Sequence, residues 1–167
     1  SLYATLYNDN MPFIYEQWIK KKTLNYLNDI EPTKKPMRAQ VLEVSTIRLE
    51  TDYLKEKVYA KIHDKELCIR CFFSEECLQK FESERKLPIN SLKGCHIIIY
   101  EFSFQFIKDF SIKSPGYDCF LNIKRFNYST NVSDGLDRLN MKELYEDEDL
   151  KDALRKRYEI LYPFSNP

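Results

Sequence analysis

The order of two hydrophobic periodicities along the chain constrains its fold more than any single motif does. Between residues 37 and 73, three segments have the pattern of β-strands, namely MRAQVLEVSTI, KVYAKIHD and LCIRCFF. A helical pattern, SEECLQKFESE, begins at Ser74, which is a favourable N-cap, and two long strand patterns follow it, CHIIIYEFSFQF and CFLNIKRFNYS. The predicted order is therefore β-β-β-α-β-β. Five strands with one helix between the third and the fourth is the order of an OB-fold barrel, so we expect a mainly β fold of this kind.

The second and third strand patterns predict a β-hairpin. They flank the short turn DKE, and both are rich in β-branched and aromatic residues. In KVYAKIHD, alternate residues fall on opposite faces, with Val58, Ala60 and Ile62 expected in the core and Lys57, Tyr59, Lys61 and His63 expected outside it.

This order divides the chain into three expected parts. Residues 1–36 form an N-terminal arm with a helix, residues 37–131 form the barrel, and residues 132–167 form a C-terminal tail. A helix in the tail is expected to pack on the barrel.

Both extensions have a helical pattern. In the arm, the helix is expected to begin near Pro12, to place Ile14 and Trp18 on one face, and to end before Pro32 and Pro36. In the tail, EDEDLKDALRKRYEIL has acidic residues at its start, which suits the helix dipole. Its apolar residues at helical spacing are Leu150, Leu154, Tyr158 and Leu161.

Composition argues against several classes of protein. Hydrophobic residues make up 43% of the 167-residue chain, which is ample for a folded globule. No apolar run approaches the ~20 residues that a membrane span requires, so we expect no membrane association. The formal net charge is zero, whereas a dedicated duplex-binding protein usually has a basic excess. No signal peptide is recognisable, so we expect a soluble intracellular protein whose five cysteines are reduced.

The stretch HDKELCIRC raises the question of a metal or redox site, because it contains a C-x-x-C spacing. If LCIRC is a strand, Cys68 and Cys71 point to opposite faces and cannot share one metal ion. A reactive C-x-x-C also normally lies at a helix N-terminus. We therefore expect no metal and no cofactor, with Cys71, Cys77 and Cys119 acting as small buried hydrophobic residues.

Catalytic chemistry is not indicated. The two histidines, His63 and His96, both lie inside strand patterns, and neither a nucleophile elbow nor a phosphate-binding glycine loop is present. We expect the protein not to be an enzyme.

Single-stranded nucleic-acid binding is the alternative function, because many OB barrels bind single strands with a basic groove and aromatic platforms. The predicted hairpin could supply such a site from Tyr59, Lys61, Arg70 and Phe72. Three further aromatic residues share one face of a later strand pattern, where they are more typical of a core than of a platform: Phe102, Phe104 and Phe106.

Several blocks of sequence resemble a known family. QWIKK, RAQVLEV, IRCFFSEECL, Gly94 before a hydrophobic strand, and FLNIKRF occur in this order, which resembles the OB domain of the shelterin protein that recruits telomerase in animals. KVYAKIHD followed by FFSEECLQKFE resembles the small OB-fold telomerase subunit of budding yeasts, the third Ever Shorter Telomeres protein. The resemblance covers Gln17 to Tyr128.

This resemblance implies a non-catalytic telomerase subunit of the nucleus and the chromosome telomere. It implies docking on the telomerase reverse transcriptase, mainly on its N-terminal domain, association with other telomerase subunits, and weak or no direct binding of single-stranded DNA. A shelterin-type adaptor in another telomere complex is a further alternative.

The resemblance also implies site residues. A contact surface after the barrel helix is acidic in the animal relative, whereas here its charge is mixed, and the matching residues are Glu82, Glu84, Arg85, Lys86, Asn90 and Lys93, with Glu43 on the first strand expected beside them. Trp18 and Asp64 match positions of the family and are expected to be structural anchors. Trp18 would hold the arm to the barrel, and Asp64 would make a turn contact or an ion pair.

Overall fold

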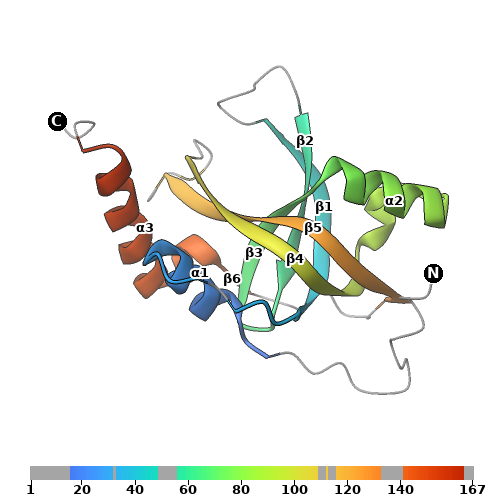
Figure 1. Cartoon of the computed structure of the whole chain (residues 1–167), viewed down its shortest axis with the longest axis horizontal. Coiled ribbons are helices and arrows are strands. Elements are labelled where there is room, and N and C mark those ends of the chain that lie inside the picture. Colours follow the sequence, from blue (N-terminus) through green and yellow to red (C-terminus); the bar gives the residue numbers. More distant parts are fainter. Residues whose placement is uncertain are drawn as a thin grey trace.

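The computed structural model describes residues 16–31, 33–48, 56–108, 112, 116–132 and 141–163 (Figure 1). The helices and strands in chain order are α1 (Ile19–Leu27), β1 (Met37–Arg48), β2 (Glu56–His63), β3 (Leu67–Phe73), α2 (Glu75–Arg85), the 3-10 helix η3 (Ile89–Leu92), β4 (Cys95–Lys108), β5 (Tyr117–Val132), β6 (Lys142–Glu143), the 3-10 helix η5 (Leu144–Glu146) and α3 (Glu148–Leu161). The five long strands and the helix between β3 and β4 are in the predicted places. No helix in the described part of the chain has the length and hydropathy needed to cross a bilayer.

The strands close into a barrel. Their order is β2-β1-β4-β5-β3, and β2 pairs in turn with β3, so the sheet has no free edge among these five strands. The pairing of β3 with β5 is parallel, and the other pairings within the barrel are antiparallel. This mixed five-stranded barrel with its helix between the third and fourth strands confirms the predicted OB-like fold.

The barrel interior is filled by the inward residues of all five strands. Ala60 and Ile62 of β2 are fully buried, as the alternation predicted, and Val58 packs against the core from a partly buried position. Buried isoleucines of β4 and Leu121 of β5 complete the centre. Because β-branched side chains pack well on a pleated surface, these positions both form the strands and fill the barrel.

Helices cover two sides of the barrel (Figure 1). Helix α2 lies at one end, while α1 and α3 pack against each other on the other side. Phe102, Phe104 and Phe106 of β4 are partly buried and pack against the core. Phe104 stacks on Tyr26 of α1 with ring centroids 5.2 Å apart, and Phe106 stacks on Tyr117, which stacks in turn on Tyr158 of α3.

The N-terminal helix begins later than predicted. Helix α1 starts at Ile19 and ends at Leu27, and Trp18 is its N-cap residue and not part of a helical face. Two hydrogen bonds fix the start of the helix at this position. The Trp18 indole donates to the Arg38 carbonyl, and the Ile19 amide donates to the Asp64 carboxylate. Pro12, Ile14 and Pro32 lie outside the described residues.

Two features of the tail differ from the sequence prediction. In α3, Leu150 and Leu154 are fully buried, but Leu161 is 46% exposed, because the last turn of the helix extends past the surface that it covers. A two-residue strand, β6, was not predicted, and it pairs in parallel with the start of β3, with Lys142 opposite Leu67. The predicted division at residues 36 and 131 stays a prediction, and β5 continues to Val132.

Candidate protein-docking surface

Helix α2 carries three of the seven predicted contact residues. Its first turn is fixed by Ser74, whose hydroxyl accepts a hydrogen bond from the Cys77 amide at 3.1 Å, and by Glu75 and Glu76, which suit the positive end of the helix dipole. Cys77 and Phe81 anchor the helix to the barrel from its buried face. The opposite face and the last turn are therefore presented to solvent.

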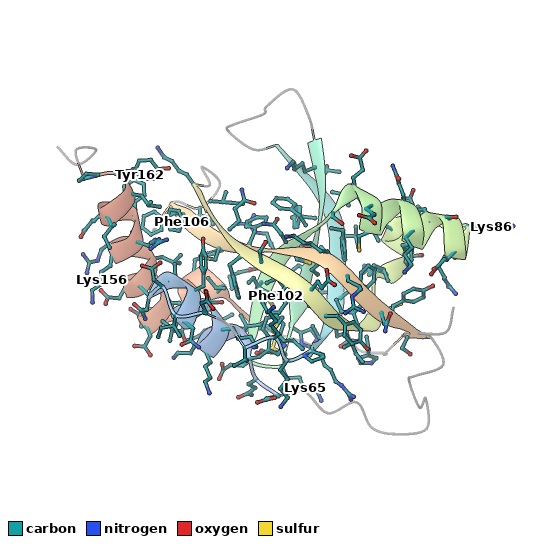
Figure 2. All side chains as sticks on the ribbon, in the orientation of Figure 1. Lys65, Lys86, Phe102, Phe106, Lys156 and Tyr162 are labelled. Carbon is teal, nitrogen blue, oxygen red and sulfur yellow. The ribbon has the colours of Figure 1, made fainter. Side chains whose placement is uncertain are left out.

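The chain turns sharply after α2 and is fixed again at once. Lys86 ends the helix in the left-handed conformation, with φ of 54°, and its amide donates to the Glu82 carbonyl at 2.8 Å. A non-glycine residue in this conformation costs on the order of 1 kcal/mol. Ile89 and Leu92 of η3 are then buried, so this exposed segment is held at both ends. Lys86 lies at the outer extremity of the molecule (Figure 2).

Six residues form what we call the docking surface: Glu82, Glu84, Arg85, Lys86, Asn90 and Lys93. Five of them are exposed, and their side chains make no ion pair or hydrogen bond with another residue that the structure describes. Their charges are mixed, as the sequence predicted. These five exposed residues contribute little to holding the fold together, which leaves their polar and charged groups available to a partner.

Arg85 differs from its neighbours because it is half-buried. Its guanidinium lies 5.5 Å from the ring centroid of Tyr128 on β5. Its buried Nε has no hydrogen-bond partner among the described residues. Burial raises the pKa of Tyr128, and the nearby Arg85 charge opposes this rise. Arg85 therefore packs the helix against the barrel as well as adding charge to the surface.

Glu43 is not joined to the docking surface by any described contact. Its carboxylate lies 3.5 Å from Lys61 on β2, and Lys61 also forms an ion pair with Glu143 of β6. Burial alone would lower the pKa of Lys61, but Glu143 and Glu43 together raise it. The structure thus places Glu43 in an ion-pair cluster with the strand that the sequence did not predict.

A groove between α2 and β5 was missed by the sequence analysis. It has a volume of about 460 Å³, and its rim includes Glu84 of the docking surface, Lys80, Lys124 and Arg125. Both Lys124 and Arg125 are exposed, although strict alternation would expose only one. The register between β4 and β5 shifts beside Glu101, which explains the departure. The one feature of the sequence that could have indicated this groove is the pair of adjacent cations in FLNIKRF.

The two predicted anchors lie close to each other in the fold. The Trp18 indole donates to the Arg38 carbonyl at 2.8 Å, which ties the start of α1 to β1. The fully buried Asp64 carboxylate accepts from the Ile19 amide at 2.8 Å and from the Glu66 and Leu67 amides at 3.0 Å. These contacts support the anchoring roles, which stay predictions until variants are measured.

His63 is buried, which corrects its predicted place on the outer face of β2. Its Nδ1 accepts from the Lys65 amide at 3.0 Å, so its proton is on Nε2, which donates to the Gln40 side-chain oxygen at 3.0 Å. Gln40 donates in turn to the Gly94 carbonyl. The side chain is covered because β1 and the turn before β4 meet at this end of β2. Burial lowers the pKa of His63 to about 4.

The hairpin residues of the alternative nucleic-acid site are largely occupied by internal contacts. Arg70 is buried and forms an ion pair with Asp118 at 2.9 Å, with its guanidinium 4.4 Å from the Phe120 ring centroid. Burial raises the pKa of Asp118 to about 6, against the opposing effect of Arg70. Phe72 is buried against Phe120, so Tyr59 is the only partly exposed aromatic residue of the four-residue platform.

All five cysteines are free and buried. Burial raises the pKa of Cys68 and of Cys77 to about 12, so neither forms a thiolate readily near neutral pH. Cys68 and Cys71 lie on a regular strand, as predicted. Within the described residues, no group of three or more histidine, cysteine or acidic side chains could hold a metal ion.

A search of curated proteins found no match to the sequence. Among solved structures, the fold is similar to that of the Est3 telomerase subunit in the yeast Hansenula polymorpha, with a TM-score of 0.53 over 90% of this chain and 93% of that chain. The identity is 15%, so this likeness concerns the fold.

The sequence itself matches a family model. The model of the shelterin complex subunit family, TPP1/ACD, matches residues 15–148, a span that includes the barrel, α1 and the start of α3. This match confirms the resemblance drawn from the sequence blocks. It also confirms the expectation of a non-catalytic protein, since the family consists of non-catalytic subunits. The chain belongs to the shelterin complex subunit family TPP1/ACD.

Proposed function

We propose that this protein is a non-catalytic, telomerase-associated OB subunit of the nucleus and the chromosome telomere. It docks on the telomerase reverse transcriptase, mainly on the N-terminal domain, and associates through it with other telomerase subunits. Family membership and the fold shared with a yeast telomerase subunit support the class of partner. The observation that carries the proposal is the docking surface, whose exposed charges have no described role in the fold.

Pre-organisation supports this surface as a contact. Its backbone is fixed by Phe81 before it and by Ile89 and Leu92 after it, so little backbone entropy is lost when a partner binds. Its acidic residues lie on α2, and Lys93 follows η3. A partner with a complementary arrangement of charges would therefore be selected for orientation as well as for affinity.

Glu43 is proposed as a separate contact, because Lys61 and Glu143 are its described neighbours. Binding of single-stranded DNA through the β2–β3 hairpin is proposed to be absent. The buried ion pair between Arg70 and Asp118 supports this, since the arginine is not available to a phosphate.

The experiment is a double charge reversal, Glu82→Lys with Glu84→Lys, tested by co-purification with the reverse transcriptase and by telomere length. Both residues are exposed, so the free energy of unfolding should change by no more than about 0.5 kcal/mol. Association should weaken by roughly 2–5 kcal/mol if these groups are desolvated in the complex, and by less at a rim.

The matched control reverses two other exposed acids, Glu66→Lys with Glu148→Lys, which makes the same change in net charge at residues outside the docking surface. This control should associate like the parent. If the Glu82/Glu84 variant folds and still associates and maintains telomeres normally, the docking surface is not the contact. Retention of shelterin proteins without the reverse transcriptase would favour the adaptor function.

A further inference from the structure

Seven cations gather on one side of the barrel although the chain as a whole is neutral. Two adjoining hollows, of about 350 and 690 Å³, share Thr33 in their walls. Seven of their lining side chains are basic and three are acidic. We call this the basic groove, and its cations are Lys21, Lys22, Lys34, Lys35, Arg38, Lys124 and Arg125. They come from α1, from the segment after it, from β1 and from β5.

Two of the three acids in the groove are already neutralised. Glu16 lies 3.5 Å from Lys35, and Glu101 lies 3.2 Å from Arg125. In contrast, Lys21, Lys34 and Lys124 form no ion pair within the described residues. The groove therefore has a net positive charge that the fold itself does not balance, which suits an anionic partner.

Aromatic rings lie between these cations. The Arg125 guanidinium is 4.9 Å from the ring centroid of Tyr100, and the Lys22 amine is 5.9 Å from that of Phe102. Both rings are partly exposed, and Phe102 lies on the α1 side of β4 (Figure 2). Burial lowers the pKa of Lys22, so this amine is partly removed from water where it meets Phe102. Cations alternating with partly exposed rings are the features that bind a phosphodiester backbone and its bases.

We infer that the basic groove binds the backbone of a single-stranded nucleic acid, DNA or RNA, weakly and without base sequence preference. The site differs from the β2–β3 hairpin, whose arginine and phenylalanine are buried. Weak binding is expected because only two rings are available for stacking and both are partly covered. None of these cations belongs to the docking surface, although Lys124 and Arg125 also line the hollow beside Glu84. The inference does not rest on docking on the reverse transcriptase, and it is tested with nucleic acid alone.

The test is fluorescence anisotropy of the whole chain with labelled oligo-dT and oligo-U of about 15 nucleotides, near the upper site size of one OB fold. We expect micromolar binding at about 50 mM salt that is largely lost by about 200 mM, because released counterions drive it. Comparison of the two oligonucleotides shows whether the groove prefers DNA or RNA.

The variant Lys21→Glu with Lys124→Glu should weaken binding at least ~10-fold and lower the salt slope by about 0.7 for each lost phosphate contact. The control, Lys57→Glu with Lys156→Glu, makes the same charge change on the hairpin and on α3, and it should bind like the parent. Circular dichroism of both variants should match that of the parent, which checks that they fold.

Three results would overturn the inference. The parent could fail to bind either oligonucleotide at about 50 mM salt, the groove variant could bind as tightly as the parent, or the control could lose as much affinity as the groove variant. Tighter binding of a polyglutamate peptide of equal charge would instead identify the partner as an acidic protein segment.

Discussion

The Asp64 carboxylate accepts a hydrogen bond from the Ile19 amide at 2.8 Å, so a residue of the β2–β3 turn caps a helix 45 positions earlier in the chain. Helix α1 lacks a side-chain cap of its own, because its N-cap residue is Trp18. The same carboxylate also accepts from the turn amides of Glu66 and Leu67. One buried group therefore closes the hairpin turn and fixes the arm to the barrel.

Removal of the Asp64 cap should destabilise the fold. Asp64→Ala leaves three amide donors without their acceptor, and we expect it to lower the free energy of unfolding by roughly 2–4 kcal/mol. Asp64→Asn should cost less, because one amide oxygen remains. Urea denaturation measures both, with Glu66→Ala as a neighbouring exposed control. Equal stability of Asp64→Ala and the control would show that the cap is dispensable.

Trp18 provides a second stability test. Trp18→Ala removes a ring that is only 4% exposed, so a loss of about 3–5 kcal/mol is expected. Trp18→Phe keeps most of the buried area but loses the hydrogen bond to the Arg38 carbonyl, and should cost about 1 kcal/mol more than packing alone predicts. If thermal denaturation shows Trp18→Ala to be as stable as the parent, the arm is not anchored through this residue.

His63 predicts a pH dependence of stability. Its pKa is about 4 in the folded state, mainly because of burial, and ~6.5 in the unfolded chain. The unfolded state therefore takes up a proton first, and stability falls as the pH drops from about 6.5 towards 4. At pH 5 the loss should reach roughly 2 kcal/mol relative to neutral pH.

The raised pKa of Asp118 acts in the opposite direction between about pH 4 and 6, so the contribution of His63 is best isolated by difference. His63→Gln removes the titrating group, and the stability difference between parent and variant should shrink or reverse as the pH falls from 7 to 5. A difference that is constant with pH would contradict the low pKa of His63.

The cysteines predict resistance to thiol reagents and to chelators. With all five buried, a disulfide-exchange reagent should react with the native protein slowly and with all five thiols only after unfolding. Metal analysis should find no stoichiometric zinc, and chelator should leave the thermal midpoint unchanged. One zinc per chain would require a bend in β3, since Cys68 and Cys71 lie three positions apart on a strand.

Local patterns were enough to predict the order of strands and helix along the chain and the N-cap at Ser74, because these depend on residues close in sequence. They could not predict that His63 is buried, since this depends on Gln40 of β1 and the turn at Gly94. The acceptor for Ile19 likewise comes from a distant turn. The residues of the docking surface are nearly continuous in sequence, so their common place after the barrel helix could be predicted, and their role as a contact stays a prediction. The basic groove joins three distant segments that only the barrel brings together.

The most direct test of the account is the dissociation constant between the purified chain and the N-terminal domain of the telomerase reverse transcriptase, measured by isothermal titration calorimetry. Measurable binding of the parent, a loss of at least ~10-fold for Glu82→Lys with Glu84→Lys, and unchanged affinity for Glu66→Lys with Glu148→Lys are predicted. An affinity of the folded Glu82/Glu84 variant equal to that of the parent would contradict docking through α2 and η3.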